Sequence, residues 1–139
     1  MELNEISQSI IGVAIEVHRA LGPGLLESAY EACLAFELAK RRLKVEQQKP
    51  IALIYQEIKL DCGYRLDLLV EDCVIVEIKA QEQILPVHKS QLLSYLRLTN
   101  RRLGLLINFN VEILRTGITL IVNNFQLFSA SSAPSALRF

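Results

Sequence analysis

The chain begins with two stretches in which apolar residues recur at helical spacing. In the first stretch the apolar positions are three or four residues apart: Ile6, Ile10, Val13 and Val17. This stripe predicts an amphipathic helix over about residues 4–20, which the loop Gly22-Pro23-Gly24 would end. A second helix is predicted over about residues 25–42. Its expected inner stripe consists of Leu26, Ala29, Cys33, Phe36 and Ala39 or Lys40.

The pattern changes from helical to alternating after residue 42. A strand or a strand pair is predicted at residues 45–55, where Pro50 marks an edge or a bulge, and further extended segments are predicted at 58–60, 64–70 and 74–80. Pro86 would begin a third helix that runs to about Asn100. The apolar run 103–109 is typical of a strand buried on both faces, and residues 117–122 of a last short strand. The predicted order α-α-β-β-β-α-β-β indicates an α/β fold, with a central mixed β-sheet flanked by helices.

The size and composition of the chain indicate one domain. Its 139 residues are 51% hydrophobic, and 15 basic residues balance 15 acidic ones. We expect a single domain over residues 1–124, because a chain of this size can bury a core. The Ser/Ala/Pro-rich residues 125–139 are expected to form a flexible C-terminal tail. The balanced charge argues against a basic protein that coats nucleic acid nonspecifically.

Cysteine usage favours a reducing compartment. Cys33, Cys62 and Cys73 form neither a disulfide framework nor a metal-ligand spacing. The acidic N-terminal segment lacks the cationic region of a signal peptide, and no apolar run is long enough to span a membrane. We therefore expect a cytoplasmic protein with no membrane partner.

Two carboxylates are predicted to face each other across a β-hairpin. The segments 64–70 and 74–80 flank the turn Glu71-Asp72-Cys73. If Asp72 is the tip, residues equally distant from it pair, and Asp67 lies opposite Glu77. Alternation would place Asp67 on one face of its strand and Leu66, Leu68 and Val70 on the other.

Such a carboxylate pair requires a cation. Opposed carboxylates repel each other, and the surrounding Leu, Val and Ile residues raise the cost of desolvation. Lys79 brings one positive charge two residues after Glu77. A divalent ion such as Mg²⁺ or Mn²⁺ would bring more charge, since it takes oxygen ligands from one or two carboxylates. These residues alone fit an ordinary cross-strand cluster neutralised by Lys79 equally well.

Several strings resemble a known family. Asp67, followed after nine residues by Glu77-Ile78-Lys79, resembles the core of the PD-(D/E)XK nuclease superfamily. The string Gly24-Leu25-Leu26-Glu27-Ser28-Ala29-Tyr30 resembles the signature of the GxxExxY protein family, a branch of that superfamily. IGVAIEVHRALGPGLLESAYE, YRLDLLVEDCVIVEIKA and QLLSYLRLTNRRLGLLINFNV extend the resemblance over about residues 4–123. Leu66 stands where the superfamily name has proline.

The resemblance implies a fold and a set of roles. A central mixed sheet would carry the acidic hairpin, and Asp67 and Glu77 would bind Mg²⁺ or Mn²⁺. The Ile78 carbonyl and Glu27 would be further metal ligands. Lys79 would orient or help deprotonate the attacking water and stabilise the phosphate charge. The implied reaction is hydrolysis of a phosphodiester bond by metal-activated water.

Four further residues are candidates with weaker signals. Gln91 and Tyr95 share a helix face, and their spacing resembles an accessory motif that holds the phosphate or its water; a polar helix rim explains them too. His18 resembles a histidine that some superfamily members place near the metal, although packing histidines are commoner. Tyr30 shares a face with Glu27 and is a candidate substrate contact, or a half-buried aromatic with a paired hydroxyl.

The function therefore has two candidate classes. The first is a nuclease acting on DNA, which is favoured over RNA, with phosphate contacts from nearby basic residues. The basic candidates are Arg65, Lys79, Lys89, Arg97, Arg101 and Arg102, and an ordinary solvated charged surface explains them equally well. The second is a non-catalytic nucleic-acid- or protein-binding module on the same fold. A homodimer or a recruiting protein partner is left open by the sequence.

Overall fold

The computed structural model describes residues 1–124, and the predicted tail over residues 125–139 lies outside the described residues. The helices are α1 (Leu3–Leu21), α2 (Glu27–Lys40) and α3 (Pro86–Leu98), with a short 3-10 helix η1 (Leu114–Gly117). The strands are β1 (Val45–Pro50), β2 (Leu53–Tyr55), β3 (Ile58–Leu60), β4 (Arg65–Val70), β5 (Val74–Lys79), β6 (Leu103–Asn108) and β7 (Ile118–Val122). The predicted order undercounts the strands between α2 and α3, because residues 45–60 form three short strands.

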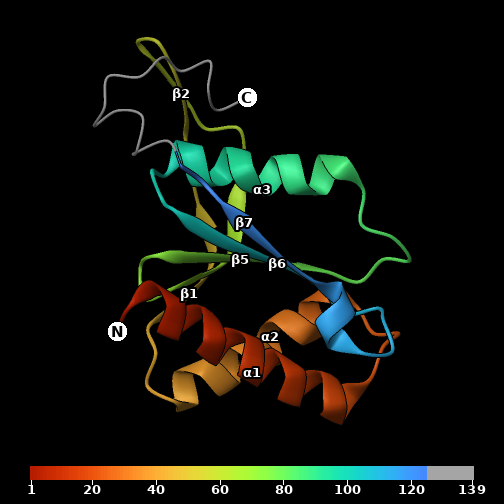
Figure 1. Cartoon of the computed structure of the whole chain (residues 1–139). Coiled ribbons are helices and arrows are strands. Elements are labelled where there is room, and N and C mark those ends of the chain that lie inside the picture. Colours follow the sequence, from red (N-terminus) through yellow and green to blue (C-terminus); the bar gives the residue numbers. More distant parts are fainter. Residues whose placement is uncertain (125–139) are drawn as a thin grey trace.

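The fold is the predicted α/β arrangement with a mixed central sheet. The sheet has five strands in the order β1-β4-β5-β6-β7, and β2 and β3 form a separate hairpin. β5 and β6 are parallel, whereas the other neighbours are antiparallel. Helices α1 and α2 cover one face of the sheet and α3 covers the other (Figure 1). The central strand β5 therefore lies between two helical layers.

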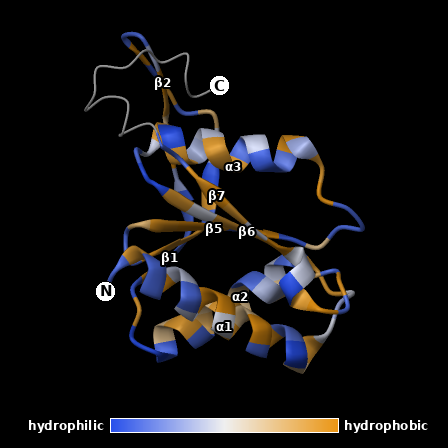
Figure 2. Cartoon of the chain, viewed as in Figure 1, coloured by the Kyte–Doolittle hydropathy of each residue, from blue (hydrophilic) through white to orange (hydrophobic). Residues whose placement is uncertain are grey.

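Each face of the sheet has its own hydrophobic core. The larger core joins α1 and α2 to residues such as Leu68, Val76 and Ile107, and the smaller joins α3 to Leu69 and Ile75. The apolar positions accordingly gather between the layers in Figure 2. All four residues of the stripe predicted for α1 are buried, as are all residues of β6. Both predictions are confirmed.

The inner stripe predicted for α2 is wrong. Leu26 is 77% exposed and Phe36 is 63% exposed, while Tyr30, Leu34 and Leu38 are fully buried. The buried residues recur every four positions, so they form a competing stripe on the same helix. The Tyr30 ring stacks on Phe109 with 4.4 Å between ring centroids, which turns this second stripe toward the sheet.

The predicted hairpin register is confirmed. Leu68 pairs with Val76, Leu69 with Ile75 and Val70 with Val74 across β4 and β5. Because the register is continuous, Asp67 lies opposite Glu77 where the strand pairing ends.

The predicted alternation of β4 is wrong at Leu66. Leu66 packs in the α3-side core, whereas Leu68 and Val70 pack in the core beneath α1 and α2. The cause lies in the neighbouring strand. The β1–β4 ladder omits the pair Gln48–Asp67, and Gln48 has a φ of 51°. Because of this local distortion, Leu66 and Leu68 point to opposite sides of the sheet, although regular alternation would place them on the same side.

Among residues 1–124, the structure contains no helix with the length and apolar character that a membrane crossing requires.

Candidate active site

The two predicted carboxylates lie where the strands β4 and β5 stop pairing. The Asp67 backbone N–H donates a hydrogen bond to Glu77 Oε2 over 3.0 Å, and the Ile78 N–H donates to Asp67 Oδ2 over 2.8 Å. Each side chain thus accepts a main-chain donor of the opposite strand. The two carboxylates thereby accept hydrogen bonds from backbone N–H groups that have no partner in the β4–β5 ladder. These bonds fix the positions of both side chains between the strand ends.

Burial raises the pKa of both carboxyl groups. Desolvation, followed by the charge of Asp67, raises the pKa of Glu77 from 4.5 to about 8, and the Glu77 side chain is 4% exposed. Desolvation also raises the pKa of Asp67, although hydrogen bonds from Ile78 and Gln48 oppose this shift. Without a cation the pair therefore retains a proton near neutral pH.

Lys79 and Glu27 belong to the two elements that meet at the acidic pair, the end of β5 and the start of α2. Lys79 follows Glu77 by two residues on β5, and its positive charge lowers the pKa of both carboxyls. Glu27, at the start of α2, accepts a hydrogen bond from the Ala80 N–H over 3.2 Å. Ala80 directly follows Lys79, so the N-terminal end of α2 and the C-terminal end of β5 meet at the acidic pair.

Two residues of this site were missed from the sequence. Glu31 lies one turn after Glu27 on α2, and it accepts hydrogen bonds from the amides of Gln47 and Gln48. Burial, followed by the charges of Asp67 and Glu27, raises the pKa of Glu31 despite these bonds. The four-residue spacing from Glu27 is the signal that would have identified Glu31. Gln48 carries no such signal.

These side chains line one open cleft of about 520 Å³ between α2 and the sheet. Its lining residues are Leu25, Leu26, Glu27, Ser28, Glu31, Gln48, Asp67 and Ala80. The cleft exposes Asp67 and Glu27 to solvent, while Glu77 lies behind them in the protein. A solute that entered here would meet carboxylates from two elements, Glu27 and Glu31 of α2 and Asp67 of β4.

Helix α3 contributes Tyr95 from the opposite face of the sheet. Tyr95 is 6% exposed, and its ring lies 6.0 Å from that of Tyr64. Burial and then the charge of Glu77 raise the pKa of the Tyr95 phenol. Gln91 is one turn earlier on α3 and exposed. Within the described residues, no hydrogen bond joins Gln91 to the two acids.

The structure does not bring Tyr30 and His18 to the cleft. The Tyr30 side chain is fully buried, donates a hydrogen bond to the Gly22 carbonyl and accepts one from the Leu25 N–H. Its hydroxyl therefore holds the loop before α2. His18 is 6% exposed, and its Nε2 is 2.7 Å from the Val111 carbonyl oxygen, beside η1. Both positions correspond to the packing alternatives for these residues.

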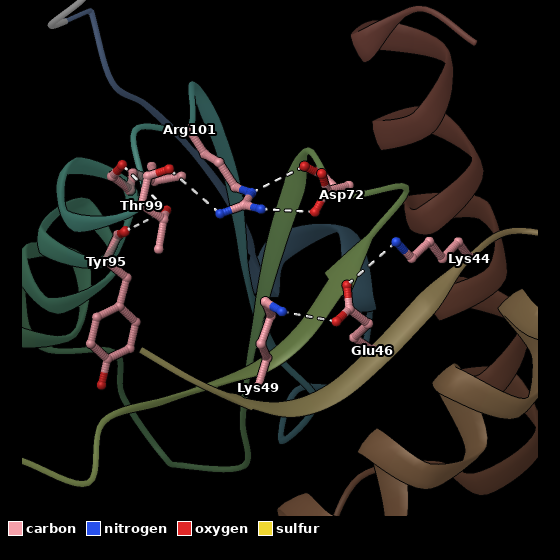
Figure 3. Close-up of polar contacts among 8 residues, drawn as sticks. Lys44, Glu46, Lys49, Asp72, Tyr95, Thr99 and Arg101 are labelled. Carbon is pink, nitrogen blue, oxygen red and sulfur yellow. Dashed lines mark hydrogen bonds and ion pairs between the residues drawn. The ribbon is translucent and has the colours of Figure 1, made fainter. Parts of the chain in front are cut away.

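One predicted phosphate contact lies elsewhere. Arg101 forms an ion pair with Asp72 at 2.9 Å and donates to the Asp72 carbonyl, as Figure 3 shows. Asp72 is in the hairpin turn before β5, whereas Lys79 ends that strand. Arg101 therefore lies at the far end of β5 from the acidic pair.

The donor set fits a hard divalent ion with few protein ligands. No group of three or more His, Cys, Asp or Glu side chains within residues 1–124 has the arrangement of a metal site. Mg²⁺ and Mn²⁺ are nevertheless bound in proteins through one or two carboxylates and several waters. The pair Asp67 and Glu77, with their raised pKa values, is a donor set of this kind.

The comparison with known proteins agrees with this geometry. A family model described as the PD-(D/E)XK nuclease superfamily matches residues 4–121. The matched stretch includes α2, the acidic hairpin and α3. No curated protein matches the chain significantly.

Proposed function

Because the chain belongs to the PD-(D/E)XK nuclease superfamily, we propose that it is a metal-dependent nuclease that hydrolyses phosphodiester bonds. The observation that carries the proposal is the opposed pair Asp67 and Glu77, with Lys79 beside it at the end of the central strand. Nucleases of this superfamily are generally phosphodiesterases, and the site has the acids and the cation that such a reaction needs.

The two carboxylates hold Mg²⁺ or Mn²⁺ in this proposal. The Ile78 carbonyl and Glu27 are the proposed further ligands. A bound ion of this kind lowers the pKa of a coordinated water and neutralises charge on the phosphate. The raised pKa of Glu77 supports the assignment, because a cation lowers the cost of ionising a buried acid.

The chain supplies the remaining groups. Lys79 would donate hydrogen bonds to the attacking water or to a phosphate oxygen. Gln91 and Tyr95, one helical turn apart on α3, would hold the phosphate from the other side. The burial of Tyr95 supports a fixed position for its hydroxyl. We do not assign substrate contacts to Tyr30 or His18, because both are buried and bonded away from the cleft.

DNA in the cytoplasm is the proposed substrate. The GxxExxY resemblance over Gly24–Tyr30 would place the protein in one branch of the superfamily. A second candidate is a non-catalytic binding module on the same fold. The scarcity of arranged acidic ligands favours it, since residues 1–124 contain no ready group of three.

A cleavage panel tests the proposal. Single-stranded, duplex, nicked and branched DNA and RNA would be incubated with Mg²⁺ or Mn²⁺ and wild-type protein, Lys79→Ala, or the matched control Lys59→Ala on the exposed strand β3. We expect wild type and Lys59→Ala to cleave at least one substrate, and Lys79→Ala to cleave none. Absence of cleavage by wild type, with Mn²⁺ binding intact, would favour the binding module.

A further inference from the structure

Gln48 links two carboxylates of the cleft through one amide group. Its Nε2 is 2.7 Å from Glu31 Oε1 and 3.2 Å from Asp67 Oδ1. The pKa of Glu31 is raised first by burial and then by the charges of Asp67 and Glu27, so Asp67 and Glu31 repel each other when both are ionised. A neutral donor between two like charges reduces that repulsion and fixes the distance between them.

The backbone of Gln48 is as unusual as its contacts. With a φ of 51°, it is the non-glycine residue with a positive φ that lies inside a strand of the described structure; the others lie in turns, loops or at helix ends. Side chains other than Asn and Asp rarely adopt this conformation, because it brings Cβ too close to the backbone. The conformation therefore needs a compensating contact at this position.

The consequence of this conformation is visible in the side chains around it. Consecutive residues of a regular strand point to opposite faces, yet Gln47 and Gln48 both donate to the Glu31 carboxylate. Opposite them, Leu66 enters the α3-side core and Asp67 lines the cleft beside α2. In a regular β1–β4 ladder, Asp67 would point toward the α3 side with Leu69. The distortion at Gln48 thus turns Asp67 toward Glu27 and Glu31.

We propose that Gln48 is a positioning residue that aims the Asp67 carboxylate into the cleft, through its left-handed backbone and through its amide. This inference rests on the proposed function, because Asp67 is taken to bind the metal. In this inference Gln48 acts through Asp67, to which its amide donates a hydrogen bond. Gln47 donates to Glu31 alone, so it is a matched control of the same residue type in the same strand.

Three variants separate the contributions. Gln48→Ala removes the amide and keeps a side chain that resists the positive φ. Gln48→Gly also removes the amide, but glycine adopts this conformation freely, so this variant keeps the fold if Gln48→Ala does not. Gln47→Ala removes one hydrogen bond to Glu31. Mn²⁺ affinity would be measured by calorimetry, global stability by urea unfolding, and kcat and KM on any substrate that the panel identifies.

We expect both Gln48 variants to bind Mn²⁺ about tenfold more weakly than wild type, as outer contacts of metal ligands commonly do when removed. Gln47→Ala should bind within about twofold of wild type, and Gln48→Gly should unfold at no lower urea concentration than Gln48→Ala. The loss of activity should appear in kcat at saturating substrate, with KM little changed. A merely structural role of Gln48 would lower stability without this pattern.

Two results would overturn the inference, and they differ. Wild-type Mn²⁺ affinity in both Gln48 variants, together with lost binding in Asp67→Asn, would remove the role of Gln48 and leave the metal site in place. Wild-type affinity in Asp67→Asn would remove the metal site itself, and with it the proposed function.

Discussion

Replacing Glu77 by glutamine should stabilise the metal-free protein at alkaline pH. The Glu77 carboxyl is almost fully buried, and its pKa is raised to about 8 by desolvation and then by the charge of Asp67. A glutamine has nearly the same shape, and its carbonyl oxygen can accept the hydrogen bond that the Asp67 N–H now donates to Glu77. The substitution therefore removes the charge with little change in packing.

The direction and size of the effect follow from proton linkage. Because the folded pKa of Glu77 lies above the unfolded value of 4.5, the folded state holds a proton that the unfolded state has lost. Stability is then complete below pH 4.5, falls between pH 4.5 and about 8, and stays low above that range. At about 1.4 kcal/mol per pH unit, the loss reaches up to about 5 kcal/mol for a fully buried group.

Urea unfolding in EDTA at pH 6 and pH 9 measures this difference. We expect Glu77→Gln to be more stable than wild type by about 2 kcal/mol at pH 6, because this pH lies about 1.5 units above the unfolded pKa of 4.5 and the unfolded wild type has already released its proton. At pH 9 the variant should be more stable by about 3–5 kcal/mol. Glu57→Gln, in the exposed turn between β2 and β3, is the matched control and should follow wild type at both pH values. Equal pH dependence of wild type and Glu77→Gln would refute the reasoning.

Three further changes have defined outcomes. Mn²⁺ should bind wild type roughly 50-fold more weakly at pH 6 than at pH 8.5, because Glu77 must release its proton; calorimetry showing pH-independent binding would contradict this. Tyr30→Phe should lower the free energy of unfolding by about 1–2 kcal/mol, since the Gly22 carbonyl loses a buried donor, and urea unfolding measures the loss. Gly117→Ala should cost about 1–3 kcal/mol in the same assay, because its Cβ would lie 2.3 Å from the Asn108 carbonyl oxygen; an unchanged midpoint would show that the η1 segment can move.

The sequence predicted those features that depend on local pattern. The α1 stripe, the buried strand β6 and the hairpin register follow from spacing alone, and the register was enough to place Asp67 opposite Glu77. The local sequence pattern, in contrast, does not show which of two apolar stripes on one helix packs against the sheet. The choice on α2 depends on the stacking of Tyr30 against Phe109, which lies far away in the sequence.

The part of the site that escaped prediction depends on a single backbone angle. Assigning side chains alternately to the two faces of a sheet assumes regular strands. The residue type of Gln48, between Gln47 and Lys49, does not predict its positive φ. The faces of Leu66 and Asp67 were therefore assigned as in a regular strand. Glu31 was accessible in principle, since it repeats the position of Glu27 one helical turn later on α2.

The hairpin turn at residues 71–73 also limits how the length of this chain can vary. The turn is far along both strands from the acids, and Asp72 is exposed, so its surroundings would tolerate an extra residue sterically. One inserted residue would nevertheless shift β5 by one position against β4, and Glu77 would rotate to the face where Val76 and Ile78 now pack. A one-residue deletion would have the same effect. The residue types of this turn are constrained locally, by the positive φ of Glu71 and Asp72 and by the Arg101–Asp72 ion pair, whereas its residue number is constrained by a carboxylate pair at the opposite end of the hairpin.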